Sequence, residues 1–260
     1  MFVDYLSPLR SELKLNIMLS LFAGEKNLSE LKSVVDARET TILHVLKEFE
    51  NLSLSEKSHG IYKLTSLGFL EAQICRQCSA ASEVVGAFKD FWLTHDISAI
   101  PASLISRLGA LKDSSLIRTE SSELGKVHGT FMQVLLSSKK IKGVSPIFHP
   151  DYVAAFRHLL SQGNSVELIL TSAVFGKTLD SADSQLLQKY IVEDKLTIFI
   201  REDLRFALTV TESSFSLGLF GLSGEYDYNN NLVSLSPESV EWGEELFKGV
   251  LAGSEKFVPK

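Results

Sequence analysis

The chain has 260 residues, of which 45% are hydrophobic and 22% charged, and a formal net charge of −6. This length fits one large or two moderate domains, the acidic balance argues against a non-specific nucleic-acid coat, and two cysteines exclude a disulfide scaffold. No apolar run is long enough to span a bilayer, and the N-terminus lacks a basic segment followed by an apolar run. We therefore expect no membrane association, no signal peptide and a cytoplasmic location.

The first predicted elements are two helices. Ser7 can cap the first, with Pro8 at its first helical position and Gly24 at its C-terminus. A short second helix follows, capped by Asn27 or Ser29.

The segment "RETTILHVLKEFENL" predicts a third helix with two distinct faces. Its apolar stripe comprises Ile42, Val45, Leu46 and Phe49. Its polar side chains fall mainly on the other side, and these are Arg38, Thr40, Thr41, His44 and Lys47. Arginine and lysine favour guanine in the major groove, and threonine can contact the thymine methyl group. We expect these five side chains to read double-stranded DNA.

Two short alternating segments, "SLSEK" and "GIYKLT", predict a β-hairpin because Gly60 supplies the positive φ that a tight turn needs. Another helix begins directly afterwards at Ser66. Three helices, a hairpin and a fourth helix follow the order of a winged helix-turn-helix. Lys57 and His59, at the wing, are expected to approach phosphates or the minor groove.

The alternative is that these polar residues are ordinary solvated side chains. Glu39, Glu48 and Glu50 on the same helix would repel phosphates if they faced DNA. Residues 1–78 carry nine lysines and arginines against ten acidic residues, so any contact with DNA must be confined to a few side chains.

From Ser66 the pattern predicts one helix to about His95, much longer than the average of about 11–12 residues. An apolar seam recurs along it at spacings of three and four: Leu67, Leu70, Ile74, Cys78, Ala81, Val85, Phe88 and Trp92. Such a seam indicates a helix that pairs with another helix. The pairing is either with a second copy, in a homodimer, or with the chain's own second domain.

The pair in "CRQC", Cys75 and Cys78, lacks the further ligands that a zinc site needs and does not follow a strand as a thioredoxin motif does. We interpret both as small packing residues. A second hypothesis has Cys78 facing its own copy in a dimer, where oxidation would cross-link the subunits.

After a boundary near residues 96–103, strands alternate with helices, which predicts an α/β domain with a mostly parallel sheet and an antiparallel edge near the end. Ligands of such sheets bind beyond the carboxyl ends of strands. The polar residues there are candidates for an anionic or polar ligand, or else serve only as turns and caps: Ser145, His149, Thr171, Ser172 and Arg201.

The sequence contains no G-x-S-x-G, Walker, GxGxxG or HExxH motif, and none of its histidines belongs to an HxK pair. We therefore expect no catalytic residues, no metal and no cofactor.

Two stretches resemble a known family. "LKEFENLSLSEKSHGIYKLTSLG" resembles the recognition helix and wing of archaeal winged-helix regulators, although Ser53 stands where that family usually has glycine. "LGLFGLSGEYDYNNNLVSLSPESVEWGEELF" is similar to the end of the regulatory domain of archaeal methanogenesis-type transcriptional regulators, and "HPDY" at 149–152 fits too. The resemblance implies a dimer, DNA binding, and an effector-sensing domain with phospholipase-D-like topology but no hydrolase activity.

We accordingly expect a winged helix over 1–66, a linker or dimerisation helix over 67–95, and an α/β regulatory domain over 96–260. The predicted function is a DNA-binding transcriptional regulator whose C-terminal domain senses an unidentified small molecule or mediates regulatory assembly. The alternative is a protein-interaction adaptor with a degenerate winged helix that binds no DNA.

Overall fold

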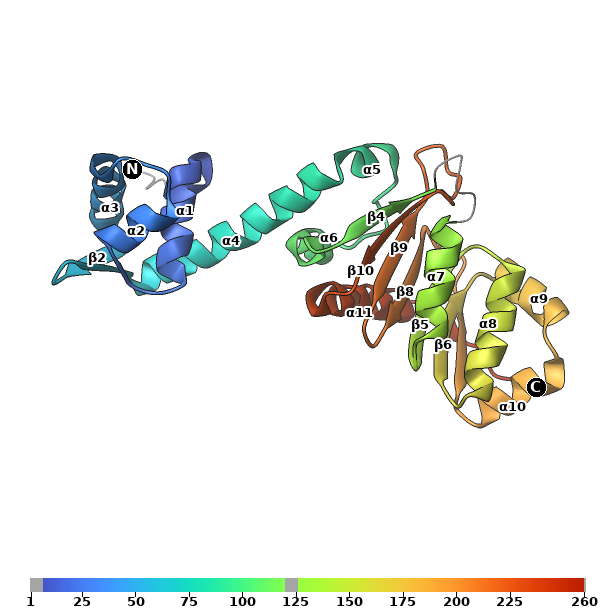
Figure 1. Ribbon diagram of the computed structural model, residues 1–260. Coiled ribbons are helices and arrows are strands. Elements are labelled where there is room, and N and C mark those ends of the chain that lie inside the picture. Colours follow the sequence, from blue (N-terminus) through green and yellow to red (C-terminus); the bar gives the residue numbers. More distant parts are fainter. Residues whose placement is uncertain (1–6, 120–125, 260) are drawn as a thin grey trace. The chain divides into compact units, whose positions relative to one another are not determined.

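The computed structural model describes residues 7–259 except 120–125 (Figure 1). The chain forms two compact units, Met1–Glu83 and Val84–Lys260. The boundary falls inside helix α4 (Ser66–Ala87), so most of this helix belongs to the first unit and its last residues belong to the second.

The first unit contains η1 (Ser7–Arg10), α1 (Glu12–Phe22), β1 (Lys26–Asn27), α2 (Leu28–Val34), α3 (Glu39–Asn51), β2 (Ser55–Ser58), β3 (Ile61–Leu64) and the start of α4. Its three strands form an antiparallel sheet in the order β1-β3-β2. The hairpin is the predicted wing, and Tyr62 packs it onto the helices with 3% of its surface exposed. The order of elements is that of a winged helix-turn-helix.

The first helix begins later than predicted. The Ser11 hydroxyl accepts from the Lys14 N–H and caps α1, whereas Ser7 and Pro8 belong to the separate 3-10 turn η1. The prediction of Asn27 as a cap is confirmed, because Asn27 and Glu30 form a reciprocal capping box at the start of α2.

Ser53 adopts the backbone conformation that a glycine would supply between α3 and the wing. Its φ is 58°, and the Leu54 N–H donates to the Phe49 carbonyl while the Ser53 N–H donates to the Glu50 carbonyl. This pair of hydrogen bonds is a Schellman motif. The Thr65 hydroxyl donates to the Ser53 carbonyl over 2.6 Å, which connects the motif to the start of α4. The serine therefore leaves the C-terminal cap of α3 intact.

Gly68 allows α4 to start directly against the end of α3. A β-carbon at this position would collide with the Leu54 carbonyl oxygen. The same turn is capped by Thr65, whose hydroxyl accepts from the Gly68 N–H over 3.0 Å. Because Gly68 has no side chain, Leu54, which directly precedes the wing in the sequence, can lie close to the first turn of α4.

Replacing Gly68 by alanine is expected to destabilise the first unit by about 1–3 kcal/mol, the usual cost of overpacking a close contact. Gly86→Ala is the matched control in the same helix, because no atom lies within 4 Å of the β-carbon it adds. The control is expected to preserve or slightly raise stability through helix propensity. Urea unfolding measures both, and equal stability of the two variants would contradict this assignment.

The long helix predicted from Ser66 is interrupted. α4 ends at Ala87, Phe88 has non-helical backbone angles, and α5 (Lys89–Thr94) follows. The Val84 carbonyl accepts from the Phe88 N–H and also from the Trp92 indole N–H over 3.2 Å, which stabilises the break.

The second unit begins with the end of α4 and with α5, and then contains α6 (Ala102–Ile105), η2 (Leu108–Leu111), β4 (Ser115–Arg118), α7 (Lys126–Leu136), β5 (Lys140–Ser145), α8 (Pro150–Ser161), β6 (Ser165–Leu170), α9 (Ser172–Ser181), α10 (Ser184–Val192), β7 (Leu196–Ile200), β8 (Phe206–Thr211), β9 (Phe215–Leu219), β10 (Asn230–Ser234), α11 (Pro237–Leu251) and β11 (Glu255–Lys256). The sequence also predicts a helix over residues 121–137, and the first part of it, 121–125, lies outside the described residues.

The sheet has the order β11-β7-β6-β5-β8-β9-β10-β4. Among the described residues, only the pairs β5–β6 and β6–β7 are parallel, and the remaining five pairs are antiparallel. The prediction of a mostly parallel sheet is therefore wrong. Strand β10 was not predicted; it pairs with β9 and with the edge strand β4, and both pairings are antiparallel.

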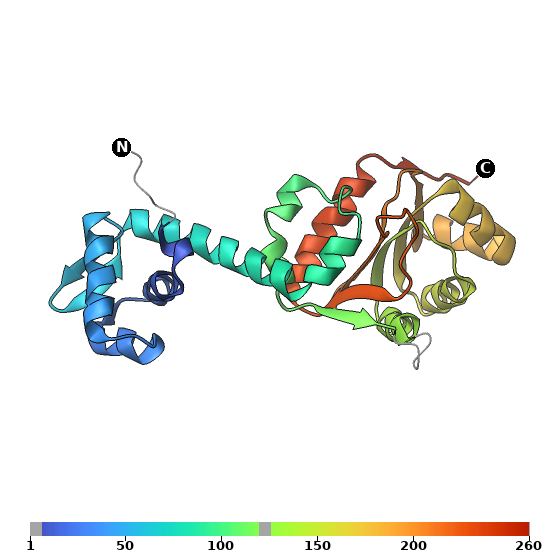
Figure 2. The same ribbon diagram turned by 90° about the horizontal axis from the view of Figure 1, so that it is seen from above.

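Helices cover both faces of this sheet. α5, α6 and α11 lie on one side, and α7 to α10 lie on the other (Figure 2). Strand β9 shows how differently the two faces are filled. Phe215, Leu217 and Leu219 are fully buried, and the Phe215 ring meets the Trp242 ring of α11 edge-on at 5.7 Å. Ser216 and Gly218 lie on the opposite face, because successive residues of a strand alternate between its two sides.

Among the described residues, no helix is both long and apolar enough to cross a membrane.

Candidate nucleic-acid interface and ligand cavity

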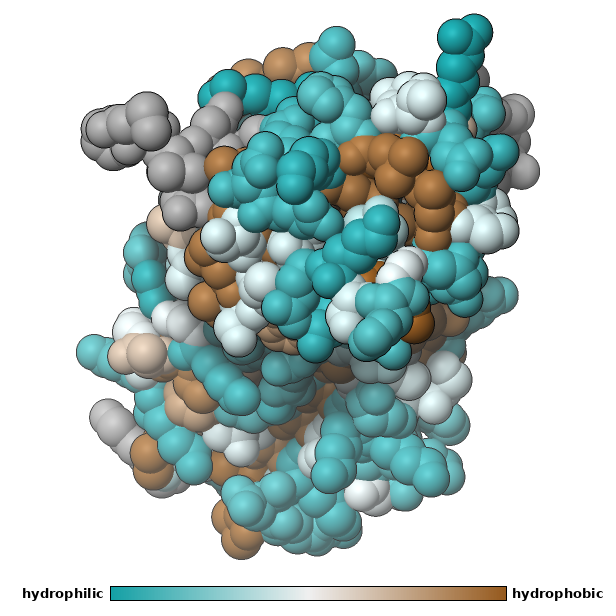
Figure 3. Space-filling model, turned by 90° about the vertical axis from the view of Figure 1, so that its left-hand side faces the viewer, coloured by the Kyte–Doolittle hydropathy of each residue, from teal (hydrophilic) through white to brown (hydrophobic). Residues whose placement is uncertain are grey.

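Helix α3 has the two faces that its sequence predicts. Ile42, Val45, Leu46 and Phe49 are all at most 4% exposed and join the core of the first unit. The seven residues proposed to contact DNA are all exposed: Arg38, Thr40, Thr41, His44 and Lys47 on or beside α3, and Lys57 and His59 on the wing. Figure 3 shows one face of the molecule, which is largely hydrophilic with separate apolar patches.

The acidic residues of α3 that argued against DNA binding have lysine partners. These are exposed or half-exposed pairs, which contribute little to stability but offset negative charge locally. The distances are 2.6 Å for Lys14–Glu48, 3.2 Å for Lys47–Glu50 and 3.9 Å for Lys32–Glu39.

The wing is closed by a two-residue turn in which both residues have positive φ, 49° for His59 and 84° for Gly60. The Lys57 ammonium lies 4.9 Å from the centre of the Tyr62 ring. A hydrogen bond with Tyr62 raises the pKa of Lys57, so the wing carries a lysine that stays charged.

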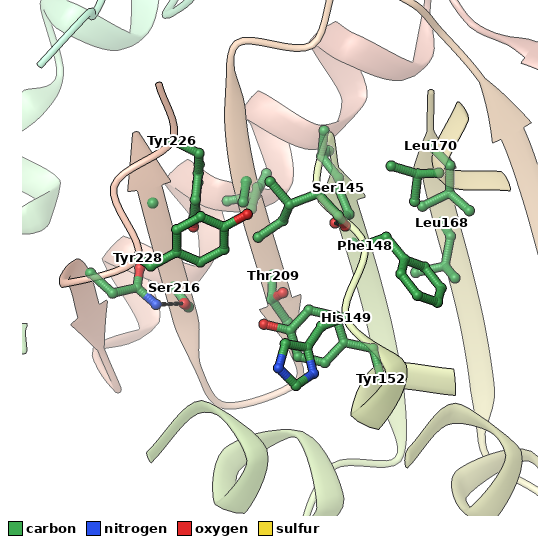
Figure 4. A pocket seen from close by; sticks show the side chains of 18 of the residues that line it. Ser145, Phe148, His149, Tyr152, Leu168, Leu170, Thr209, Ser216, Tyr226 and Tyr228 are labelled. Atoms are coloured by element: carbon green, nitrogen blue, oxygen red, sulfur yellow. Dashed lines mark hydrogen bonds between the residues drawn. The ribbon is translucent and has the colours of Figure 1, made fainter. Parts of the chain in front are cut away.

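A cavity of about 280 Å³ lies on the face of the second unit's sheet that α8 and α9 cover, opposite α11 (Figure 4). Strands β5, β6, β8, β9 and β10 form its floor, and its walls come from α8, α9, the segment after β5 and the segment before β10. In Figure 4 the rings of Phe148, His149 and Tyr152 lie on one side of Thr209, and those of Tyr226 and Tyr228 on the other.

The described lining is apolar and aromatic, with hydroxyl and amide groups but no carboxylate, lysine or arginine. Burial raises the pKa of Tyr152 to about 12 and raises that of Tyr226 as well, so both phenols remain neutral near pH 7. A β-carbon at Gly218 would collide with the Tyr226 hydroxyl, so the absence of a side chain on β9 allows this ring to sit against the sheet.

Asn231 provides a buried polar atom without a partner. Its side-chain N–H donates to the Ser216 hydroxyl over 2.8 Å, whereas its amide oxygen accepts no hydrogen bond. The residue is 7% exposed and lines the cavity. A buried acceptor without a donor is rare, and a bound molecule is one way to satisfy it.

The sequence-predicted ligand residues divide into two groups. Ser145 and His149 line the cavity. Thr171, Ser172 and Arg201 are absent from its lining and have structural partners: the Thr171 hydroxyl caps α9, the Ser172 N–H donates to Glu202, and Arg201 pairs with Asp203 and donates to the Val250 carbonyl.

Sequence reasoning missed Tyr152, Tyr226, Tyr228 and Asn231 as cavity residues. The segments "GEYDYNN" and "HPDY", which contain Tyr226 and Tyr152, indicate the family resemblance but do not by themselves predict a cavity. A cluster of two tyrosines and three asparagines over residues 226–231 is the signal in the sequence, because aromatic side chains with a polar group suit places where apolar and polar contact are both needed.

The segment that supplies Tyr226 also holds the end of α5. His95 is 5% exposed, its Nδ1 lies 2.7 Å from the Phe91 carbonyl oxygen, and its Nε2 lies 3.0 Å from an Asp227 carboxylate oxygen. Burial opposes ionisation of Asp227, but hydrogen bonds from Asn230, the Asn229 N–H and His95 together lower its pKa.

The two cysteines lie in different environments. Cys75 is a buried core residue, as expected, and burial raises the pKa of its thiol to about 11. Cys78 is exposed on α4, so the expectation of a packing role within this unit is wrong for this residue. No cluster of metal-ligating side chains occurs within the described ranges.

Two models of one protein family match this chain. The N-terminal domain of the methanogenesis regulatory protein FilR1 matches residues 7–78, and its middle domain matches residues 124–252. The methanogenesis regulatory protein FilR1 of Methanothrix harundinacea is 34% identical over 245 residues, which cover 92% of this chain and 54% of that protein. The chain thus spans about half the length of this curated relative.

Solved structures show weaker similarity. TrmBL2, described as an archaeal chromatin protein with a novel mode of DNA binding, is 16% identical with a TM-score of 0.46, and the match covers 93% of this chain and 92% of that one. Nuc, a phospholipase D family member from Salmonella typhimurium, is 15% identical with a TM-score of 0.41 over 56% of this chain and 99% of that one. The family of this chain is therefore shown by the two family models and the curated relative, not by these structures.

The order of elements in the first unit and the match of residues 7–78 place that unit in the winged helix-turn-helix class. The chain belongs to the family of the methanogenesis regulatory protein FilR1. This family and the curated relative are regulatory proteins rather than enzymes, as the sequence predicted for this chain.

The raised pKa of Tyr152 predicts a loss of stability in alkali. Its stabilising contribution is complete below the ordinary pKa of 10.0 and is lost as the pH rises towards about 12. Tyr152→Phe is therefore expected to lose less stability than the wild type across that interval. Urea unfolding at a series of pH values measures this, and identical pH dependence of the two proteins would contradict it.

Proposed function

We propose that this protein is a transcriptional regulator that binds double-stranded DNA through α3 and the wing. The observation that carries the proposal is the division of α3 into a fully buried apolar stripe and an exposed polar face, beside a hairpin that presents Lys57 and His59. An exposed recognition helix with a flanking wing has the form that enters a major groove while contacting the backbone beside it.

The residues on this surface suit different parts of DNA. Arg38, at the N-terminus of α3, is suited to guanine or phosphate, and Thr41 and His44 follow on the exposed face. Lys57 at the wing is suited to phosphate, a contact that contributes affinity but no sequence information. The limited number of basic groups implies specific recognition rather than extensive coating.

The second unit is proposed to sense a small molecule in its cavity. The support is a concave space lined by aromatic rings, hydroxyl groups and an unsatisfied amide oxygen. A ligand that binds one conformation more tightly would shift the population towards it, and through the linker helix would alter DNA affinity. The proposed division remains a winged helix over 1–66, a linker over 67–95 and a regulatory domain over 96–260.

The protein is further proposed to act as a homodimer through α4. Members of the predicted seam are exposed: Leu67 by 39%, Leu70 by 62%, Ile74 by 47% and Val85 by 50%. Large apolar side chains in a row along one helix favour a partner helix. A dimer would also present two recognition helices, as operators with two half-sites require.

Arg38→Gln is expected to weaken binding about tenfold, or about 1.4 kcal/mol, on a duplex selected from a random library with the wild-type chain. Lys57→Gln is expected to weaken binding on all sequences and to reduce the salt dependence by about one counterion. Fluorescence anisotropy at several salt concentrations measures both effects.

Arg157→Gln serves as the control for these variants, because Arg157 is also exposed but lies on α8 of the second unit. It should bind like the wild type. If no duplex is selected, or if Arg38→Gln and Lys57→Gln bind normally, the DNA-binding proposal fails. The adaptor alternative predicts that outcome, together with capture of a protein partner that depends on α3.

Ile74→Asp is expected to convert a dimer into a monomer, because a carboxylate on the seam would lose its hydration on pairing. Val192→Asp is the control, since Val192 is 82% exposed at the end of α10. Sedimentation measures the change. Oxidation should then cross-link the wild type through Cys78 but not Cys78→Ser. If the protein is a dimer in solution but gives only monomer on a non-reducing gel after oxidation, the two Cys78 residues do not face each other in that dimer.

A further inference from the structure

We propose that the cavity of the second unit takes an uncharged, largely apolar molecule that carries a ring and a hydrogen-bond donor, and that it rejects phosphates and other anions. This inference deepens the proposed ligand sensing and rests on it. It departs from the expectation of an anionic or polar ligand at the strand ends.

The positions where an anion would bind are already satisfied by the protein itself. At the start of α8, the Asp151 N–H donates to His149 Nδ1, and the Asp151 carboxylate lies 3.7 Å from the same nitrogen. At the start of α9, Thr171 and Glu202 accept from the backbone N–H groups. At these two helix N-termini, the N–H groups named above already have acceptors, and a carboxylate lies nearby. An anion would gain no hydrogen bond from them and would be repelled by the carboxylate.

The described lining of the cavity contains no lysine or arginine, and its one histidine, His149, accepts the Asp151 N–H through Nδ1. Arg201 forms hydrogen bonds with Asp203 and with the Val250 carbonyl, outside the lining. Bringing an anion into a space without a lysine or arginine side chain would remove its hydration without replacement. An uncharged molecule does not incur this cost.

The walls suit flat rings. The His149 and Tyr152 rings lie 5.3 Å apart, the Tyr226 and Tyr228 rings lie 4.9 Å apart, and Figure 4 shows the two pairs on different sides of the space. The apolar part of the lining includes Phe148, Phe156, Leu168, Leu170 and Val174. Aromatic and aliphatic walls of this kind gain by contact with an apolar ring.

The floor supplies the polar part of the recognition. The Asn231 amide oxygen is an acceptor without a donor, while its N–H is engaged by Ser216. A site with an unsatisfied acceptor favours a ligand with a donor over an isosteric ligand without one, because the latter leaves the acceptor unpaired. The structure therefore points to a ligand O–H or N–H at Asn231.

Three matched probes test the class of ligand. N-phenyl-1-naphthylamine is neutral and has one N–H donor, its 8-sulfonate derivative adds an anionic group, and 1-phenoxynaphthalene replaces the N–H by oxygen. On the full chain, the neutral amine should bind with enhanced fluorescence, and the sulfonate at least tenfold more weakly. The phenoxy compound should displace the amine several-fold less effectively than unlabelled amine displaces itself.

Two variants locate the binding, since apolar probes also adhere to exposed helix faces. Ala207→Phe fills the cavity from β8 and should abolish binding of the amine. Ala154→Phe makes the same substitution on the exposed surface of α8 and should leave binding unchanged. The thermal unfolding of each variant shows whether it is folded.

Tighter or equal binding of the sulfonate, or unchanged binding in folded Ala207→Phe, would overturn the proposed class. Equal displacement by the phenoxy compound would overturn the donor requirement at Asn231. None of these measurements involves DNA, whereas failure of the proposed function would appear in the Arg38→Gln and Lys57→Gln titrations. The two failures are therefore distinguishable.

Discussion

The alternation of side chains along β9 is the constraint on which the second unit depends. Phe215, Leu217 and Leu219 have no exposed surface and pack towards α11, where Gly243 allows Phe215 to approach the helix closely. The intervening Ser216 and Gly218 face the other side. A strand with large residues on one face and small ones on the other thus supplies both a core and a cavity floor.

Local signals were sufficient for most of the first unit. The apolar stripe of α3 and the turn at His59 and Gly60 are determined by residues near one another in sequence, and both predictions are confirmed. The exact start of α1 was missed because Ser7 and Ser11 both have capping side chains. The Ser11 backbone is extended and its hydroxyl accepts from the Lys14 N–H, a choice that spacing alone does not reveal.

Long-range pairing explains the larger errors. Strand periodicity indicates that a segment is extended but does not say which strand lies beside it, so the antiparallel pairing of β4 with β10 was not foreseen. The cavity depends on the same distant pairings. The strand-end rule identified Ser145 and His149, whereas Tyr226 and Asn231 reach the space only because β9 pairs with β8 and β10 pairs with β9.

The contact between His95 and Asp227 has a mechanical consequence. Asp227 is the neighbour of Tyr226, whose ring is part of the cavity wall, and His95 directly follows the last residue of α5. The Asp96 N–H also donates to the Phe220 carbonyl, and the Leu222 N–H donates to the Thr94 carbonyl. Backbone hydrogen bonds in both directions therefore connect the end of α5 to the segment after β9. One peptide unit and the Asp227–His95 contact therefore separate the wall of the cavity from the end of α5, which is the shortest covalent and hydrogen-bonded connection described between that wall and this helix.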